Sequence, residues 1–468
     1  MNNINAYIDT KSGLKIIVNN NPNSESVAVS FMIRLGSIYE TEKLRGSSHL
    51  IEHLMFKGTS KIPDKLALSR KFDSMGAIYN AYTDYNLTSY HIKVQKKFLE
   101  STINLLGQIV SDSLFREDDF NNERPVVIEE LIKNKEDEQS HLIELYHKII
   151  FNDTPYGNSI GGNPDNIKEL DYKTVKKYWK DNYCSNNLLI SVSGNTNMER
   201  VIKLIESSKL LNRISKSKKT NNLQIKLPLQ NNPKCNVITK DSLEQTQLVI
   251  GFPTFGASNP DKFGLAIIKT ILAGNMSSRL FTKLRDDYGL AYSVSGNISQ
   301  YEHFGEFNIL SGVDSTNLCN FNITKGDVKA DALSVIINEL FKITKEKVSE
   351  TELQIAKDSL IGGILLDFEN NQNISEFYGR DCLLDIPINI ISNYTNNIKK
   401  VTISDIYRIS NNIIKPNKIN VAMIGNIDSD KVSNYLDRIV DIWDKNKEKN
   451  SLQEPFNKIV KSNKSWFF

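Results

Sequence analysis

The spacing of hydrophobic residues in the first part of the chain predicts an alternation of strands and helices. Short apolar runs with the period of strands precede longer patterns with the period of helices, which contain few glycines or prolines. The predicted strands are residues 14–18, 26–36 and 186–195, and the predicted helices are residues 47–57, 65–75, 96–113 and a longer pattern from about Glu117 to Phe151. We therefore expect one α/β domain over residues 1–210.

The pattern breaks after this region and then starts again. Residues 211–234 are basic, rich in asparagine and poor in apolar periodicity, as linkers are, although a solvated surface loop would have the same composition. A strand pattern, a helix pattern and a strand that ends in a Gly-Asn turn follow at residues 245–254, 262–274 and 411–428. This order repeats that of the first domain, so the sequence predicts a divergent internal duplication.

The length of the chain agrees with this organisation, because 468 residues are too many for one hydrophobic core. We expect an α/β (α+β) fold of two homologous domains, each an antiparallel-rich mixed sheet layered with helices. The first domain covers residues 1–210, residues 211–234 are a linker, and the second domain covers residues 235–468.

Composition and charge narrow the function only a little. The chain is 40% hydrophobic and 24% charged, which is typical of a soluble globular protein. A net charge of +3, without a large basic region or an acidic tail, gives no reason to expect a nucleic-acid partner. Charge therefore says little about partners.

The cysteines and the N-terminal region together predict the cellular compartment of the protein. The four cysteines form no CxxC pair, which favours reduced, packed thiols. The N-terminal residues lack an apolar core and contain no arginine before Arg34, so we expect neither a secretory signal nor a transit peptide. No apolar run approaches the ~18 residues of a transmembrane helix. We therefore expect a cytoplasmic protein without a membrane span.

The two predicted domains differ at one place that carries chemistry. When the glycine that ends each segment is aligned, HLIEHLMFKG (49–58) lies opposite LAIIKTILAG (265–274). In this register His49, Glu52 and His53 have two apolar counterparts and one lysine. The helix does not need these three residues for packing, so the second domain should lack the site that they form in the first.

These three residues have the spacing of a catalytic zinc site. At 3.6 residues per turn, His49, Glu52 and His53 lie within an arc of about 100°. Two imidazoles at i and i+4 can reach one Zn²⁺ at ~2.0–2.1 Å, and a nearby glutamate can accept a proton from a zinc-bound water. The pattern arises by chance in about one chain in two hundred of this composition, so a third ligand is needed to support it.

The third ligand is expected from the acidic segment 121–137, NNERPVVIEELIKNKED. Glu123 and Glu130 are seven residues apart and share a helix face, whereas Glu129 is rotated by about 100° from Glu130. Runs of this kind are also common as solvated helix faces, and spacing alone does not choose among the three acids. Pro125 suggests that a helix starts or kinks within the segment.

The motifs together resemble a known family. HLIEHLMFKGT, followed later by ERPVVIEEL, is similar to the inverted-motif (H-x-x-E-H) zinc metallopeptidases, the family of pitrilysin and mitochondrial processing peptidase, in its short two-domain type. Further segments match this family in order: RLGSIYE (34–40), GAIYNAYTDYNLTSYH (76–91), TPYGNSIGG (154–162) and MSSRLFTKLRDDYGLAYSV (276–294). The resemblance covers nearly the whole chain.

The resemblance implies a role for each polar residue of the motifs. It implies that His49, His53 and Glu130 bind one Zn²⁺ per chain, that Glu52 is the general base, and that Glu123 supports the site. The choice of Glu130 as the third ligand therefore rests on the resemblance.

The resemblance also implies residues that act on the substrate. Arg285 and Tyr292 are expected to donate hydrogen bonds to a substrate carbonyl or oxyanion. Their proximity rests on the resemblance, because Gly289 interrupts any helix between them. Asn80 and Ala81 are expected on an edge strand that a substrate peptide extends by main-chain pairing.

These expectations combine into one function with one alternative. The resemblance implies a zinc-dependent endopeptidase that hydrolyses extended or unfolded peptides in a clamshell chamber, either in oligopeptide degradation or in presequence-type processing. Because four such domains enclose the chamber in this family, a homodimer is expected, or a heterodimer with a paralogue. The alternative is a non-catalytic structural paralogue that serves as a scaffold subunit, against which the intact motif argues.

Overall fold

The first half of the sequence forms a six-stranded mixed sheet. The strand order is β1-β2-β6-β3-β5-β4, and every neighbouring pair is antiparallel except β2 and β6. Its strands are β1 Asn3–Ile8, β2 Lys15–Asn20, β3 Ser26–Ile33, β4 Ile78–Thr83, β5 Thr88–Gln95 and β6 Leu188–Gly194. β4 is therefore an edge strand, paired with β5 on one side only among the described residues.

The second half of the sequence forms a five-stranded sheet that, like the first, has one parallel pair among antiparallel ones. Its order is β7-β13-β8-β10-β9, with β7 and β13 parallel and the other pairs antiparallel. The strands are β7 Lys234–Thr239, β8 Gln245–Phe255, β9 Ala291–Gln300, β10 Phe304–Asp314 and β13 Asn420–Gly425, and a separate hairpin pairs β11 Ile323–Lys325 with β12 Val328–Ala330. Two antiparallel-rich mixed sheets layered with helices confirm the predicted fold class.

The computed structural model describes residues 3–9, 11–216, 223, 225–319, 323–325 and 328–452, so part of the predicted linker lies outside the described residues. The helices between the strands of the first half are α1 Ser47–Met55, α2 Lys65–Ser74, α3 Leu99–Asp112, α4 Glu117–Glu136, α5 Glu138–Ile150, α6 Pro164–Glu169, α7 Tyr172–Asn182 and α8 Met198–Ser207. Those of the second half are α9 Lys262–Ala273, α10 Arg279–Phe281, the π-helix η7 Thr282–Asp287, α11 Ala332–Lys345, α12 Glu350–Asp367, α13 Asn371–Leu383, α14 Ile391–Lys400, α15 Ile403–Ile413 and α16 Ser429–Lys445.

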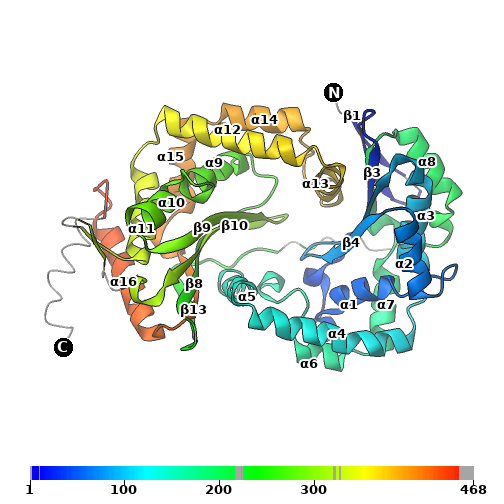
Figure 1. Cartoon of the computed structure of the whole chain (residues 1–468), viewed down its shortest axis with the longest axis horizontal. Helices are drawn as coiled ribbons and strands as arrows, with labels where there is room; N and C mark the ends of the chain where they lie inside the picture. The colour runs from blue at the N-terminus through cyan, green and yellow to red at the C-terminus, as the bar shows by residue number, and fades with distance from the viewer. Residues whose placement is uncertain are drawn as a thin grey trace. The chain divides into compact units, whose positions relative to one another are not determined.

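The chain divides into two units, and each unit takes in a helix from the other half of the sequence. The first unit consists of the described residues of Met1–Asn134, Asn158–Gln224 and Ile364–Ile390, and the second contains the rest. In the first unit α13 packs on β3 and β6, and in the second unit α5 packs on β13 and β8 (Figure 1). The pattern predicted two domains that are each continuous in sequence, whereas each unit contains a helix from the other half of the sequence.

The two faces of the first sheet differ in chemistry. Val27, Val29, Phe31 and Ile33 alternate along β3 toward one face, where they join the hydrophobic core with α1 and α3. The residues between them, such as Ser30, point to the face that α13 covers. The core therefore lies on the side of the sheet that carries α1.

The helical pattern predicted from Glu117 to Phe151 is two helices rather than one. Asp137 has extended backbone angles, and its carboxylate accepts a hydrogen bond from the Ser140 N–H at 2.8 Å, so it ends the helical run and caps α5. Pro125 lies inside α4, and the helix begins earlier, at Glu117. The helix therefore does not start at this proline, and a kink there stays a prediction.

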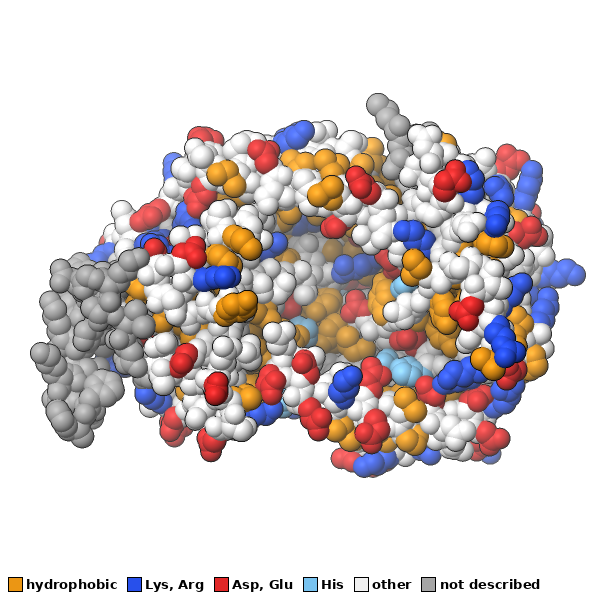
Figure 2. All heavy atoms as spheres, in the orientation of Figure 1, with side chains coloured by type: hydrophobic (Ala, Val, Ile, Leu, Met, Phe, Trp, Pro, Cys, Tyr) orange, Lys and Arg blue, Asp and Glu red, His pale blue; other side chains and the backbone are white. Residues whose placement is uncertain are grey.

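Surface character agrees with the small net charge. On the face shown in Figure 2, acidic and basic side chains are interspersed on both units. Among the helices that the structure describes, none combines the length and the apolar character needed to cross a membrane.

Candidate metal centre

The helix α1 begins at a glycine that no other residue fits. Gly46, its N-cap, has φ +84°, and a β-carbon there would lie 2.4 Å from the carbonyl oxygen of Gly161. The side chain of Glu40 supplies the missing cap, because its carboxylate accepts hydrogen bonds from the N–H groups of Gly46 (2.7 Å) and Ser48 (2.6 Å). This start fixes the helix that carries the histidines.

His49, His53 and Glu130 bring three ligand atoms together. Nε2 of His49 lies 3.3 Å from Nε2 of His53, and Oε2 of Glu130 lies 3.8 Å and 3.5 Å from these two nitrogens. Donors at ~2.05 Å around a tetrahedral ion are about 3.3 Å apart. The cluster therefore fits Zn²⁺ in both donor type and spacing.

The helix α4 distinguishes the three acids that sequence spacing left open. Its buried side chains lie on one face and include Glu123, while Glu129 is exposed and outside the cluster. Glu130 is half-buried and reaches both histidines. Of these two acids, the structure thus brings Glu130 close to both histidines and leaves Glu129 exposed.

Glu123 contacts His53 at the ring nitrogen that does not face His49. Nδ1 of His53 lies 3.0 Å from Oε1 of Glu123, and Lys57 forms an ion pair with the other carboxylate oxygen. Burial alone would raise the pKa of Glu123, but His53 and Lys57 outweigh it and lower this pKa. Because an ionised carboxylate only accepts hydrogen bonds, the proton of neutral His53 stays on Nδ1 and leaves Nε2 for a metal.

The two histidines have opposite pKa shifts. Burial lowers the pKa of His49 to about 4, with help from His53 and against the charge of Glu130. Burial also acts to lower the pKa of His53, but the contact with Glu123 and the charges of Glu52 and Glu130 outweigh it and raise this pKa. His49 is therefore neutral, as a metal ligand must be, throughout the neutral pH range.

Glu52 lies on the same helix face and is held by a residue of β4. Its Oε2 accepts a hydrogen bond from the hydroxyl of Thr83 at 2.8 Å. Burial raises the pKa of Glu52, and the hydrogen bond from Thr83 only partly offsets this effect. A carboxylate with a raised pKa close to a metal site is suited to accept and return a proton.

The other predicted residues lie in two places. Arg285 and Tyr292 belong to the second unit, on η7 and β9, and the guanidinium carbon of Arg285 lies 5.2 Å from the ring centre of Tyr292. Gly289, with φ +62°, ends the helical turn between them, as its position in the sequence indicates. The two side chains are close, and Tyr292 is 76% exposed.

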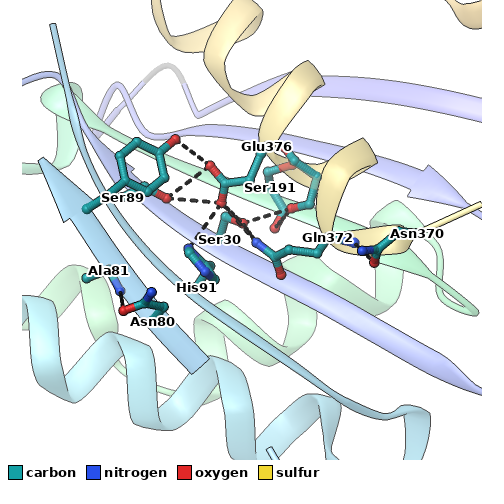
Figure 3. Close-up of polar contacts among 11 residues, drawn as sticks. Ser30, Asn80, Ala81, Ser89, His91, Ser191, Asn370, Gln372 and Glu376 are labelled. Carbon is teal, nitrogen blue, oxygen red and sulfur yellow. Dashed lines mark hydrogen bonds and ion pairs between the residues drawn. The ribbon is translucent and has the colours of Figure 1, made fainter. Parts of the chain in front are cut away.

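Asn80 and Ala81 lie on the edge strand β4 of the first unit (Figure 3). Their β5 partners are His91 and Tyr90. The side-chain oxygen of Asn80 accepts a hydrogen bond from the N–H of Ala81 at 2.9 Å. This main-chain donor of the edge strand is thus occupied by the side chain of the preceding residue.

Sequence reasoning missed the residues that hold this site in place. Glu40, Lys57 and Thr83 all lie in or beside the motifs, but their roles depend on contacts across the fold. For Thr83 the sequence offers one signal, because the alternation of a strand puts Thr83 on the same face of β4 as Ala81.

Two family models match the chain. The model described as "Insulinase (Peptidase family M16)" matches residues 15–164, and the model described as "Peptidase M16 inactive domain" matches residues 169–360. The first match contains His49, Glu52, His53 and Glu130. The second contains the pair Arg285 and Tyr292.

Known proteins resemble the chain over most of its length. An uncharacterized zinc protease of Rickettsia felis is 30% identical over 375 residues, which are 79% of this chain and 85% of that protein. An uncharacterized zinc protease of Bacillus subtilis is 30% identical over 376 residues, 80% of this chain and 87% of that protein. The crystal structure of a protease from Helicobacter pylori has a TM-score of 0.82 at 21% identity and covers 91% of this chain and 100% of its own, which agrees with the fold class.

Proposed function

This chain belongs to the insulinase peptidase family, M16, and on that premise we propose that it is a zinc-dependent endopeptidase. The observation that carries the proposal is the set of three ligand atoms of His49, His53 and Glu130, whose separations of 3.3–3.8 Å suit a tetrahedral ion. The relatives named as zinc proteases support the same metal.

The proposed mechanism assigns each polar side chain one task. Bound Zn²⁺ would supply a water of lowered pKa, near ~7, and polarise the substrate carbonyl. Glu52 accepts a proton from the attacking water at the carboxylate oxygen that Thr83 does not contact, and later gives this proton to the departing amine. Glu123 keeps His53 oriented throughout.

Arg285 and Tyr292 are proposed to stabilise the oxyanion. A guanidinium and a phenol both donate hydrogen bonds, and their stacking limits the freedom of each side chain. We propose that a homodimer provides them, with the zinc ligands of one subunit and this pair from the other.

The proposed substrate is an extended peptide that pairs with β4. A main-chain partner suits any sequence, because it needs the N–H and C=O groups of an edge rather than particular side chains. Asn80 and Ala81 lie at this edge, and Tyr82, which is 37% exposed, flanks it. Such binding favours unfolded segments and oligopeptides over folded proteins.

The second candidate function is a scaffold without catalysis. The match of residues 169–360 to a domain described as inactive favours it for the second half of the chain. Glu52 argues against it for the first half, because a structural zinc site needs no free carboxylate beside its ligands.

A peptide library distinguishes these functions. Zinc-loaded protein is expected to cleave a mixed library at internal bonds, as identified by mass spectrometry, and a chelator is expected to abolish cleavage. Glu52→Gln should retain zinc and lose at least about a hundredfold in rate, whereas Glu129→Gln, which changes an exposed carboxylate one residue from Glu130, should behave as wild type. If Glu52→Gln cleaves as fast as wild type, the mechanism is wrong.

A further inference from the structure

The helix α13 covers the first sheet through polar as well as apolar contacts, and the polar ones lie at its centre. On the sheet, Ser30 and Ser191 are buried beneath it. The hydroxyl of Ser375 donates to Ser30 Oγ at 3.1 Å, and the hydroxyl of Ser191 donates to the carbonyl of Ser375 at 2.7 Å. Hydrogen bonds have direction, so these contacts fix the position of the helix more closely than apolar packing alone would.

Glu376 is the centre of this interface. Its Oε1 accepts hydrogen bonds from the hydroxyls of Ser30 (2.6 Å) and Ser89 (3.1 Å) and lies 3.6 Å from Nδ1 of His91 (Figure 3). Its Oε2 accepts a hydrogen bond from the phenol of Tyr82 at 2.7 Å. One carboxylate thus binds residues of β3, β5 and β4.

The donors around Glu376 leave little capacity for a ligand. Gln372, one turn earlier on α13, adds an amide donor to Oε1 at 3.1 Å. The side chain of Glu376 is only 20% exposed. With hydrogen bonds from two serines, a tyrosine and a glutamine, this carboxylate serves as an anchor and not as a binding site for a substrate cation.

The anchor lies one residue away from the proposed general base. Tyr82 and Thr83 are neighbours on β4, so their side chains point to opposite faces of the sheet. Tyr82 is held by Glu376 on one face, and Thr83 donates its hydrogen bond to Glu52 on the other. The end of the edge strand is therefore fixed from both sides.

We propose that Glu376 is a positioning residue for the reaction, acting through β4 on Glu52 and on the edge where the substrate pairs. The inference rests on the proposed function. It gives the second half of the sequence a direct part in the metal-bearing unit, because α13 supplies this carboxylate. The proposed proton acceptor, Glu52, then depends on a side chain that lies more than three hundred residues later in the sequence.

Three variants of the full-length chain test the anchor. Glu376→Ala removes it, Glu376→Gln keeps one oxygen that Tyr82 can reach, and Glu369→Gln changes an exposed carboxylate just before α13 as the matched control. Hydrogen exchange of the segment 78–83 is measured for each, because it reports on β4 without any activity. We expect exchange in Glu376→Ala to be about tenfold faster, that in Glu376→Gln intermediate, and that in Glu369→Gln unchanged.

Kinetics with an internally quenched peptide and zinc analysis complete the test. In Glu376→Ala we expect unchanged zinc content, a raised KM and a lowered kcat, with kcat/KM about tenfold below wild type. Adding Tyr82→Phe should then cost little more, because both changes remove the same link. Wild-type exchange in segment 78–83 of Glu376→Ala would overturn the proposal, as would unchanged KM and kcat per zinc-loaded molecule. If the wild-type protein cleaves no peptide, the proposed function fails and with it the role of Glu376 in the reaction, whereas the exchange data still decide whether Glu376 anchors β4.

Discussion

His53 uses its two ring nitrogens for different partners, and this division shapes the candidate site. Nε2 faces His49 and Glu130, whereas Nδ1 contacts Glu123. The second contact sets the orientation of the ring before any metal binds. We therefore expect Glu123 to raise the affinity for a metal without being one of its ligands.

Replacing Glu123 by Gln should therefore weaken zinc binding. We expect the dissociation constant, measured by competition with a chromophoric chelator, to rise by roughly ten- to a hundredfold. Glu129→Gln is the control on the same helix, since Glu129 is exposed and outside the cluster. Equal zinc affinities of the two variants would show that Glu123 does not support metal binding.

At the scale of elements, the start of α1 decides where the histidines lie. Gly46 combines φ +84° with a backbone contact that excludes a β-carbon, whereas Gly76 has φ +58° and open space around it. The two glycines therefore separate the cost of the left-handed conformation from the cost of crowding.

Gly46→Ala and Gly76→Ala should differ in both stability and zinc binding. Gly76→Ala is expected to lower the free energy of unfolding by about 1–2 kcal/mol, the cost of a left-handed alanine. Gly46→Ala should lower it further and weaken zinc binding, because α1 must shift away from Gly161. Chemical denaturation and zinc titration measure the two effects, and equal losses would show that crowding at Gly46 is relieved without cost.

The end of α13 is bound to the first sheet by charge. Lys15 donates to the carbonyl of Cys382 (3.1 Å) and Arg34 to that of Leu383 (3.2 Å), and both cations contact Asp385. Cations at a helix C-terminus are favourable because its free carbonyls carry partial negative charge. Burial acts to raise the pKa of Asp385, but Lys15 and Arg34 outweigh it and lower this pKa.

The pKa shift of Asp385 predicts a pH-dependent contribution to stability. Because the pKa is lower in the folded state, the contribution is present above the ordinary aspartate pKa of about 3.9 and is lost as the pH falls through the folded value. Asp385→Asn should therefore be less stable than wild type at pH 6, and the difference should shrink below about pH 4. The effect is small because the side chain is 63% exposed, and a difference independent of pH would contradict its assignment to the carboxylate.

The sequence predicted the elements better than their connections. Periodicity located α1 and β3 because each buries a regular stripe of its own residues. The break at Asp137 was missed because a single cap residue hardly changes the helical pattern around it. Likewise, spacing in the sequence did not choose between Glu129 and Glu130, and only the packing of α4 within the first unit places Glu130 near the histidines.

At the scale of the whole molecule, a proposed dimer that shares its sites makes a sharp prediction. A chain with Glu52→Gln and a chain with Arg285→Ala should each be inactive alone. If the subunits exchange at random, half of the dimers are mixed and each has one intact site, so about a quarter of wild-type activity should return. Absence of recovery after verified subunit exchange would show that each chain uses its own arginine.

Each unit contains one helix from the other half of the sequence, α13 in the first and α5 in the second, and this has a consequence for synthesis. The first sheet is complete once β6 has emerged, but the face that α13 covers stays uncovered until residues 371–383 have been translated. The nascent first half therefore cannot finish folding on the ribosome before most of the second half exists, which places long-range contacts at the end of folding. A protease that nicks the chain between residues 211 and 234 would likewise leave two fragments, each holding a helix that completes the other.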